Sequence, residues 1–249
     1  MDCIKAFSRT NIRYDGAEYS DYDDVAVEDT ITLFVNDMRI ATLVASPDMF
    51  RELCIGYLIS EGVVTGFDEI QQVIVDENKM EAYSKVSSFD QVELWHEIRS
   101  SGCIGIKWWT NEDIRVVSDA RFSKQVIKDS LQFLDTYTRQ KTHGVHTAAL
   151  FSRDGDLLAQ AVDVGRHSAV DKVIGAFAGN DFSRVFLLSS GRQPAGMVLK
   201  AARAGIPLIV SKAAPINTGI ESALQTGVTL VCFAGDRQFS VYSHGERIG

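Results

Sequence analysis

Alternating apolar and polar residues predict a β-hairpin in the first fifth of the chain. Ile31, Leu33 and Val35 would share one face of a strand, a tight turn at residues 36–37 would follow, and residues 38–44 would return as the second strand. The residues before the hairpin include the cluster Tyr19, Asp21, Tyr22, Asp23 and Asp24, and we expect them to form a polar lead-in.

Helical spacing of apolar residues predicts a helix directly after this hairpin. We expect it to begin at residues 46–47, where Ser precedes Pro, and to end at Gly62. The apolar residues that would line one side of the helix are Phe50, Leu53, Cys54, Tyr57 and Leu58. A mostly strand-like region over 70–98 then leads into a loop around Cys103.

Strands and helices alternate in the second half, after a connecting helix with Ile127, Leu131 and Leu134 on one side. This alternation predicts an α/β fold with parallel strands joined by right-handed crossovers. The predicted strands are 147–151, 157–162, 185–189, 208–211 and 229–233, and helices follow at 194–204 and 218–225. We place a domain boundary near Asp119, which separates an N-terminal α+β domain (1–118, ending in the Cys103 loop) from a C-terminal domain (119–249).

The segment 163–172 has the pattern of an anion-binding turn between a strand and a helix. Gly165 allows an unusual backbone turn, Arg166 and His167 follow it, and Ser168 with Asp171 resembles a capping box that opens a helix. The first amides of such a helix attract anions, so the segment predicts a phosphate site. The alternative is that Arg166 and His167 only bond neighbouring carbonyls or an acidic side chain.

Two further strand ends carry a cation before a helix. Ser190, Gly191 and Arg192 follow one predicted strand, and Lys212 follows the next. Ligands of open α/β sheets bind beyond the carboxyl ends of the strands, so these residues would join Arg166 and His167 in one phosphate-binding site. The alternative reading makes Arg192 and Lys212 solvated helix caps.

Cys103 is the one cysteine flanked by small residues, with Gly102 before it and Gly105 close behind. A sulfur carrier must present its thiol to a donor and then to an acceptor, which such a loop favours. The attacking form would be the thiolate, which nearby cations stabilise. The alternative is a small buried hydrophobic residue, the role we expect for Cys54 and Cys232.

Histidines at positions 143, 146 and 167 raise the possibility of a zinc site. Zinc deaminases combine His-x-Glu with Pro-Cys-x-x-Cys, and the only His-x-Glu here begins at His244, almost at the chain end. No thiolate pair follows it. We therefore predict no bound metal and expect His146 to support the anion pocket instead.

Charge and composition narrow the function classes. The chain has 249 residues and a formal net charge of −8, which argues against broad binding to nucleic acid or to membrane surfaces. No apolar run reaches membrane-spanning length, and the start of the chain lacks an apolar signal segment. With four irregularly spaced cysteines, we expect a reducing, cytoplasmic compartment.

Several of these segments together resemble the FdhD/NarQ family, the formate dehydrogenase accessory sulfurtransferases. The strongest match is the run from Asp163 to Lys172, and weaker matches lie at residues 35–36, 46–48, 56–64, 190–192, 205–207 and 214–215. The likeness extends from about Thr30 to the C-terminus. The chain departs from the family pattern at Val162, Ser168, Gly196 and, where a second loop cysteine is common, Ile106.

The resemblance implies a C-terminal α/β/α domain of cytidine-deaminase-like topology without zinc ligands, a smaller N-terminal α+β domain and a homodimer. It implies a cytoplasmic sulfurtransferase that takes sulfur from a cysteine desulfurase as a persulfide on Cys103. The sulfur would pass to the molybdenum cofactor (Mo-bis-molybdopterin guanine dinucleotide), bound as cargo, before the cofactor is inserted into the catalytic subunit of formate dehydrogenase.

The resemblance also implies that the last predicted strand end contacts the guanine dinucleotide, through Phe233, Ala234, Gly235, Asp236, Arg237 and Gln238. Turn statistics alone would make this segment a plain surface hairpin. The competing function is a cofactor-binding chaperone in which Cys103 is inert, because only one loop cysteine is present. A single thiol is nevertheless sufficient for persulfide transfer.

Overall fold

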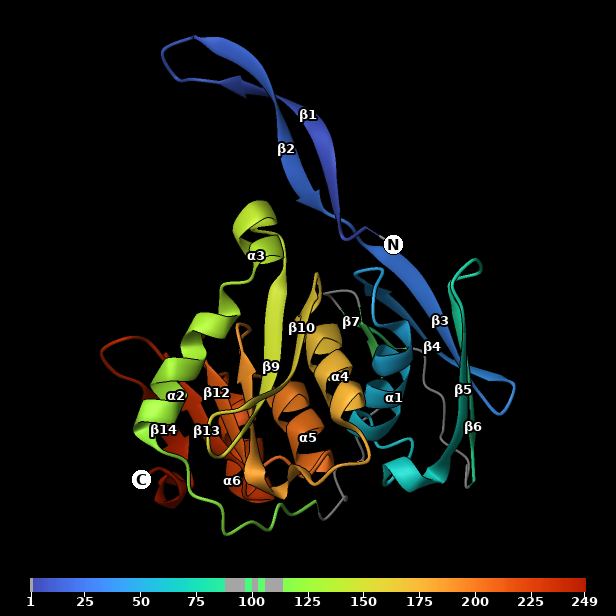
Figure 1. The fold of residues 1–249 in the computed structure, drawn as a ribbon, viewed down its shortest axis with the longest axis vertical. Coiled ribbons are helices and arrows are strands. Elements are labelled where there is room, and N and C mark those ends of the chain that lie inside the picture. Colours follow the sequence, from blue (N-terminus) through green and yellow to red (C-terminus); the bar gives the residue numbers. More distant parts are fainter. Residues whose placement is uncertain (1, 88–96, 100–102, 106–113) are drawn as a thin grey trace.

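The computed structural model describes residues 2–87, 97–99, 103–105 and 114–249 (Figure 1). The chain forms two six-stranded sheets, with helices packed between and around them, and a separate two-stranded hairpin. This arrangement confirms the predicted mixed α/β class. The cytidine-deaminase-like topology and the domain boundary near Asp119 stay predictions.

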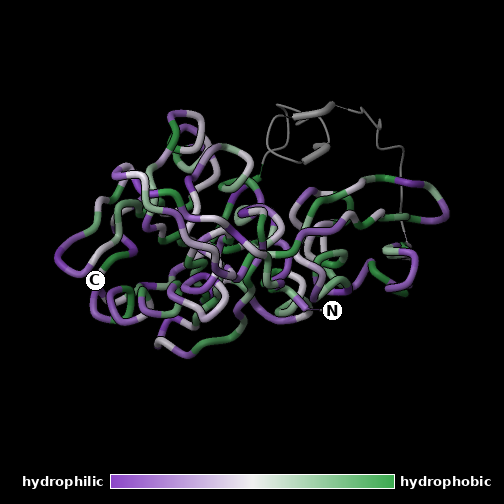
Figure 2. Tube along the Cα trace, turned by 90° about the horizontal axis from the view of Figure 1, so that it is seen from above, coloured by the Kyte–Doolittle hydropathy of each residue, from purple (hydrophilic) through white to green (hydrophobic). Residues whose placement is uncertain are grey.

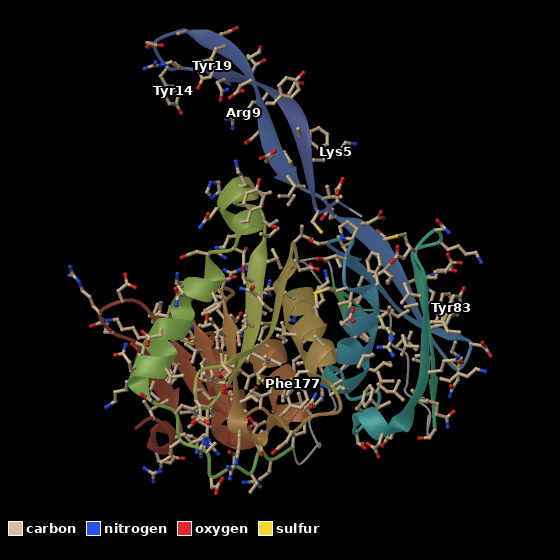
Figure 3. The ribbon with its side chains drawn as sticks, viewed as in Figure 1. Lys5, Arg9, Tyr14, Tyr19, Tyr83 and Phe177 are labelled. Carbon is tan, nitrogen blue, oxygen red and sulfur yellow. The ribbon has the colours of Figure 1, made fainter. Side chains whose placement is uncertain are left out.

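The predicted polar lead-in is in fact a long hairpin, formed by β1 (Ile4–Ile12) and β2 (Glu18–Ala26). It extends away from the rest of the molecule, with Tyr14 and Tyr19 in its outer part (Figure 3). Across the pair, Arg9 Nη1 lies 2.7 Å from Asp23 Oδ2. The strands pair through an antiparallel backbone ladder and bury almost none of their side chains, so the apolar alternation that reveals a half-buried strand is missing from their sequence.

The smaller sheet has the strand order β5-β6-β3-β4-β8-β7. The predicted hairpin is confirmed as β3 (Asp29–Val35) and β4 (Met38–Ala45), joined by Asn36 and Asp37, which both have positive φ. The other strands of this sheet are β5 (Ile70–Asp76), β6 (Glu81–Val86), β7 (Glu97–Arg99) and β8 (Cys103–Gly105).

Helix α1 (Phe50–Ser60) begins later than predicted, after Met49 in the left-handed region. Ser46 and Asp48 do not cap it, because both bind the other half of the chain. The hydroxyl of Ser46 accepts from the amide of Val164 at 3.2 Å, and Asp48 pairs with Lys172. Gly62, with φ of 71°, follows the last turn of the helix as predicted.

The larger sheet has the order β10-β9-β11-β12-β13-β14. Its strands are β9 (His146–Ser152), β10 (Leu157–Asp163), β11 (Val185–Ser189), β12 (Leu208–Ser211), β13 (Thr229–Cys232) and β14 (Ser240–Ser243). As the alternation of strands and helices predicts, β11, β12 and β13 pair in parallel, whereas β9 and β14 run antiparallel to their neighbours. Short turns join β9 to β10 and β13 to β14, and each turn reverses the chain direction.

Two hydrophobic clusters cover the two faces of the larger sheet. On one face lie α4 (Arg166–Phe177), α5 (Ala195–Arg203) and α6 (Asn217–Thr226), whose buried residues share a core with α1 and the smaller sheet. On the other lie α2 (Lys124–Ser130) and the short helix η2 (Leu131–Leu134), followed by α3 (Tyr137–Thr142). Hydrophobic and hydrophilic stretches accordingly alternate through both halves (Figure 2). No helix in the described part of the chain is long and apolar enough to cross a membrane.

Helices α1 and α4 lie side by side and touch through their backbones (Figure 1). A Cβ atom on Gly56 would lie 1.7 Å from the carbonyl oxygen of Asp171, and one on Gly175 would lie 1.9 Å from that of Glu52. Only glycine fits either position without moving a helix. The contact presses the helix of the 163–172 segment directly against the N-terminal half.

Candidate functional site

The predicted site residues gather along one edge of the larger sheet. β10 runs in the same direction as β11, β12 and β13, because β9 between them is antiparallel to both of its neighbours. The carboxyl ends of these four strands therefore share an edge, and His146 begins β9 opposite Asp163 at that same edge. The segments that follow these strand ends carry the residues predicted from sequence. They are Arg166 and His167 in the first turn of α4, and Ser190, Gly191, Arg192, Lys212 and 233–238 in loops.

Helix α4 begins at Arg166, three residues earlier than a capping box at Ser168 would place it, so that prediction is wrong. Gly165 is the N-cap residue, with an ordinary φ of −103°, and the Asp163 carboxylate accepts from its amide at 2.7 Å. Ser168 and Asp171 are buried in the helix. Arg166 and His167 therefore form its first turn, where backbone amides without helical acceptors favour a bound anion.

Gly191 gives the Arg166 side chain its place at this edge. A Cβ atom on Gly191 would lie 2.9 Å from Cβ of Arg166 and 3.1 Å from its Cδ, so the arginine stem lies against the glycine backbone. The Gly191 carbonyl accepts from Ser211 Oγ at 2.8 Å and from Gln193 Nε2 at 2.7 Å, which fixes this turn. The Ser-Gly-Arg segment thus positions Arg166 as well as contributing Arg192.

His146 lies within a cluster of guanidinium groups. Its Nδ1 is 3.2 Å from Ser190 Oγ, which also accepts from the Thr147 amide at 3.0 Å. Burial lowers the pKa of His146, and the positive charges of Arg166, Arg139 and Arg192 lower it further. Sequence reasoning missed Arg139, which comes from α3 and carried no motif. A neutral histidine among arginines indicates a region of positive potential, as an anion site requires.

The pKa of His167, like that of His146, is lowered. Burial lowers its pKa to about 3, with further contributions from Lys200, Arg166 and His146. At neutral pH the ring is therefore uncharged, and it can donate or accept one hydrogen bond without adding to the charge of the edge.

Arg192 and Lys212 differ in how far their charges are compensated. Arg192 is exposed and makes no ion pair with any described residue. Lys212 Nζ lies 3.3 Å from Asp135 Oδ2, and the Lys212 amide donates to the Ser189 carbonyl at 3.3 Å. The two alternatives for these cations were phosphate-binding residues and solvated helix caps. The charge of Arg192 is uncompensated among the described residues and remains available to a phosphate, whereas Asp135 partly neutralises that of Lys212.

Residues 233–238 form a fixed loop after β13. The Phe233 amide donates to the Ala213 carbonyl at 3.2 Å, the Ala234 amide to that of Ser211 at 2.9 Å, and the Gly235 amide to that of Gln238 at 3.0 Å. Phe233 has a positive φ of 52° and a ring that is 51% exposed. These bonds place the loop beside the Lys212 turn.

Two fully buried lysines anchor the rest of the 163–172 segment, and sequence reasoning missed both roles. Lys172 Nζ lies 2.7 Å from Asp163 Oδ2 and donates to the Ser46 carbonyl at 3.0 Å. Lys200 Nζ lies 2.8 Å from Asp171 Oδ1 and 2.6 Å from Glu61 Oε1. Burial alone would lower the pKa of Lys200, but the Asp171 and Glu61 carboxylates together raise it. Both lysines join the C-terminal half to the N-terminal one.

Cys103 lies on the smaller sheet, where β8 pairs with β4 and Cys103 is opposite Leu43. Its side chain and residue 102 lie outside the described residues, and so does the position of Ile106. Strand β4 leads from Leu43 to Ser46, whose amide donates to Asp163 Oδ2 at 3.0 Å. One continuous strand thus links the backbone at Cys103 with the segment that opens α4.

The other cysteines are poorly suited to nucleophilic chemistry. Burial raises the pKa of both Cys54 and Cys232 to about 12, as expected of small buried hydrophobic residues. Cys3 is half-buried, and burial followed by the charge of Asp48 raises its pKa. None of these three thiols is poised as a thiolate.

Of the histidines considered as an alternative zinc site, His143 and His146 have different structural surroundings. His143 ends α3 with a positive φ of 50°, whereas His146 bonds Ser190. Within the described residues, no group of three His, Cys, Asp or Glu side chains could hold a metal ion.

This chain is similar to known proteins in both sequence and fold. The FdhD/NarQ family model matches residues 26–249. The sulfur carrier protein FdhD of Methanothermobacter thermautotrophicus is 37% identical over 218 residues, covering 82% of this chain and 83% of that protein. The protein of the same name from Bacillus subtilis is 33% identical, covering 95% of each chain. A crystal structure of a putative formate dehydrogenase accessory protein from Desulfotalea psychrophila superposes with a TM-score of 0.84 at 25% identity, covering 100% of both chains.

The chain belongs to the FdhD/NarQ family, which confirms the resemblance seen in its motifs.

Proposed function

We propose that this protein is a sulfur carrier that delivers sulfur to the molybdenum cofactor of a formate dehydrogenase. The observation that carries the proposal is the cationic edge around Arg166 and His146, joined through β4 to the strand bearing Cys103. An anionic cofactor bound at this edge would be connected to the strand of Cys103 by hydrogen bonds along β4. The names of the relatives, sulfur carrier protein FdhD, support the same role.

In the first step, the Cys103 thiolate attacks the outer sulfur of a persulfide on a cysteine desulfurase. A new S–S bond forms at Cys103, the S–S bond of the donor breaks, and the donor cysteine leaves as a thiolate. In the second step, the outer sulfur passes to the cofactor, which is the substrate. The Cys103 thiolate is released, and a reduced molybdenum centre supplies the two electrons that convert the sulfur to sulfide.

The residues of the edge bind and orient the cofactor in this scheme. Arg166 and Arg192 supply charge-assisted hydrogen bonds to phosphate, and the first-turn amides of α4 add to them. The hydroxyl of Ser190 and the neutral ring of His146 supply uncharged hydrogen-bonding groups next to these arginines. The loop 233–238 contacts the guanine part of the cofactor. The proposed partners are therefore a cysteine desulfurase and the catalytic subunit of formate dehydrogenase, in the cytoplasm, where thiols stay reduced.

The proposed homodimer is supported by the β1–β2 hairpin. A two-stranded hairpin is only marginally stable in water, yet this one exposes Phe7, Ile12, Tyr14 and Tyr22. Light scattering of the full chain should give twice the monomer mass, and charged residues at Ile12, Tyr14 and Tyr22 should shift it towards the monomer. A monomeric wild type would contradict this part of the proposal.

Persulfide formation tests the carrier role directly. We expect incubation with a cysteine desulfurase and cysteine to add one reductant-sensitive sulfur to the intact wild-type mass and none to Cys103→Ala. Cys3→Ala is the matched control, because Cys3, unlike Cys54 and Cys232, is only partly buried, and this variant should still gain the sulfur. No gain with an active desulfurase would favour the alternative function, a cofactor-binding chaperone with an inert Cys103.

A further inference from the structure

A pocket of about 350 Å³ lies between helix α2 and the loop after β13. We call it the α2 pocket, and its lining residues are Lys124, Gln125, Lys128 and 235–239. It opens on the sheet face that carries α2, opposite the face that carries α4. Sequence reasoning assigned Gly235 to Gln238 to a ligand but had no role for α2.

The charges that line the α2 pocket are strongly unbalanced. Three of the side chains are cationic, from Lys124, Lys128 and Arg237, and Asp236 is the one acidic group. Within the described residues, none of these four side chains makes an ion pair or a hydrogen bond. The nearby acid on the same helix, Asp129, instead accepts from Gln125 Nε2 at 2.8 Å. The pocket therefore keeps a net positive charge, with three cations against one carboxylate.

Lys124 and Lys128 are four residues apart on α2, so the two like charges share one side of the helix. Lys128 lies in the last turn, where a cation is favourable, whereas Lys124 in the first turn is unfavourable both to the helix dipole and beside Lys128. The carbon stems of both lysines, with Phe239, provide an apolar wall, while their charged ends remain in water. Such a wall with a cationic rim fits an organic anion, and the volume is within the range of small-molecule sites.

We propose that the α2 pocket binds the phosphate groups of one of the two guanine dinucleotides of the cofactor, with Lys124 and Lys128 as phosphate-binding residues, while the Arg166 edge holds those of the other. The inference rests on the proposed function in one respect, because the proposed function has the 233–238 loop bind the guanine part of the nucleotide. The loop and α2 then hold the ligand from two sides. Arg237 adds a third cation at the same rim.

Titration calorimetry with two probes, guanosine diphosphate and guanosine, separates the phosphate contacts from those of the base. Replacing both lysines (K124A with K128A) should weaken guanosine diphosphate binding about tenfold or more, because each lost charge-assisted bond weakens affinity, and leave guanosine binding unchanged. The charge-conserving pair K124R with K128R should keep most of the affinity. Alanine favours helix, so the doubly substituted α2 should remain folded.

The matched control replaces two exposed lysines of the smaller sheet region, K79A with K85A, which removes the same charge far from the pocket. It should bind guanosine diphosphate as the wild type does. Unchanged affinity in the α2 variant, or an equal loss for guanosine, would overturn the role of the lysines while leaving the proposed function standing. A wild type that binds no guanosine diphosphate would overturn both.

Discussion

Lys200 on α5 and Asp171 on α4 form a fully buried ion pair, with Nζ 2.8 Å from Oδ1 and 2.9 Å from Oδ2. Glu61 and Ser60 from the end of α1 complete the coordination of the ammonium. The pair therefore joins three helices from both halves of the chain. It also brings a positive charge close to His167.

Removing one partner of this pair should cost far more than removing a surface pair. Lys200→Met leaves Asp171 and Glu61 buried without a cation, and we expect a loss of about 3 to 5 kcal/mol in the free energy of unfolding. Urea denaturation measures it. Arg9→Met, which removes an exposed pair with Asp23, should cost no more than about 1 kcal/mol. Equal losses would mean that the buried pair contributes nothing beyond an exposed one.

His167 should make stability depend on pH. Its folded pKa of about 3 lies below the ordinary value of 6.5, so between these values the unfolded chain binds more protons than the folded one. The contribution of His167 to the free energy of unfolding is then fully present above pH 6.5. It is lost as the pH drops towards 3, by at most about 1.4 kcal/mol per pH unit.

The comparison with His167→Gln isolates this contribution, because the carboxylates titrate in both proteins. Denaturation at several pH values should show the variant losing less stability than the wild type between pH 6 and 4. Parallel curves would show that His167 is protonated as easily in the folded protein as in the unfolded chain.

Arg166→Ala should weaken guanosine diphosphate binding by about 1 to 3 kcal/mol if its guanidinium holds phosphate. Calorimetry measures the change. Arg153→Ala is a suitable control, because Arg153 follows the far end of β9 from His146 and its exposed side chain pairs only with neighbouring Asp154 among the described residues. An Arg166→Ala protein with wild-type affinity would make the arginine purely structural.

Gly191→Ala should reproduce part of that effect without removing the arginine. The new methyl group would meet the Arg166 stem at 2.9 Å, so the stem must move and the guanidinium with it. We expect weaker nucleotide binding and a modest change in stability, because a side chain can shift. Gly219→Ala would instead meet the Gln193 carbonyl oxygen at 2.1 Å and should mainly destabilise the fold. The two variants should therefore separate binding from stability in calorimetry and thermal unfolding.

Local pattern was sufficient to predict five of the six strands of the larger sheet, but β14 (Ser240–Ser243) was not among the predicted strands. The strands at 185–189 and 208–211 lie where apolar runs placed them, because each run is short and bounded by polar or glycine residues. Arg166 and Ser190 come together because the strands before them run in the same direction and end at one edge, as the rule for such sheets predicts. His146 joins them from the start of antiparallel β9, which the order of elements did not predict.

The buried charges could not be predicted in this way. Lys172 and Lys200 lie on helices whose sequence gives no sign of a buried ammonium, and their partners, Ser46 and Glu61, come from the other half of the chain. The same long-range contacts moved the start of α1, because Ser46 and Asp48 bind the α4 segment instead of capping a helix. Tertiary contacts here override the local signal.

The glycine contact between α1 and α4 has a mechanical consequence. With backbone against backbone at Gly56 and Gly175, and buried lysines on either side, the two helices have no side-chain layer that would let one slide over the other. The two sheets should therefore move as a single rigid block. Within the described residues, the distance between the Arg166 edge and the β4 backbone opposite Cys103 should therefore stay constant when a ligand binds.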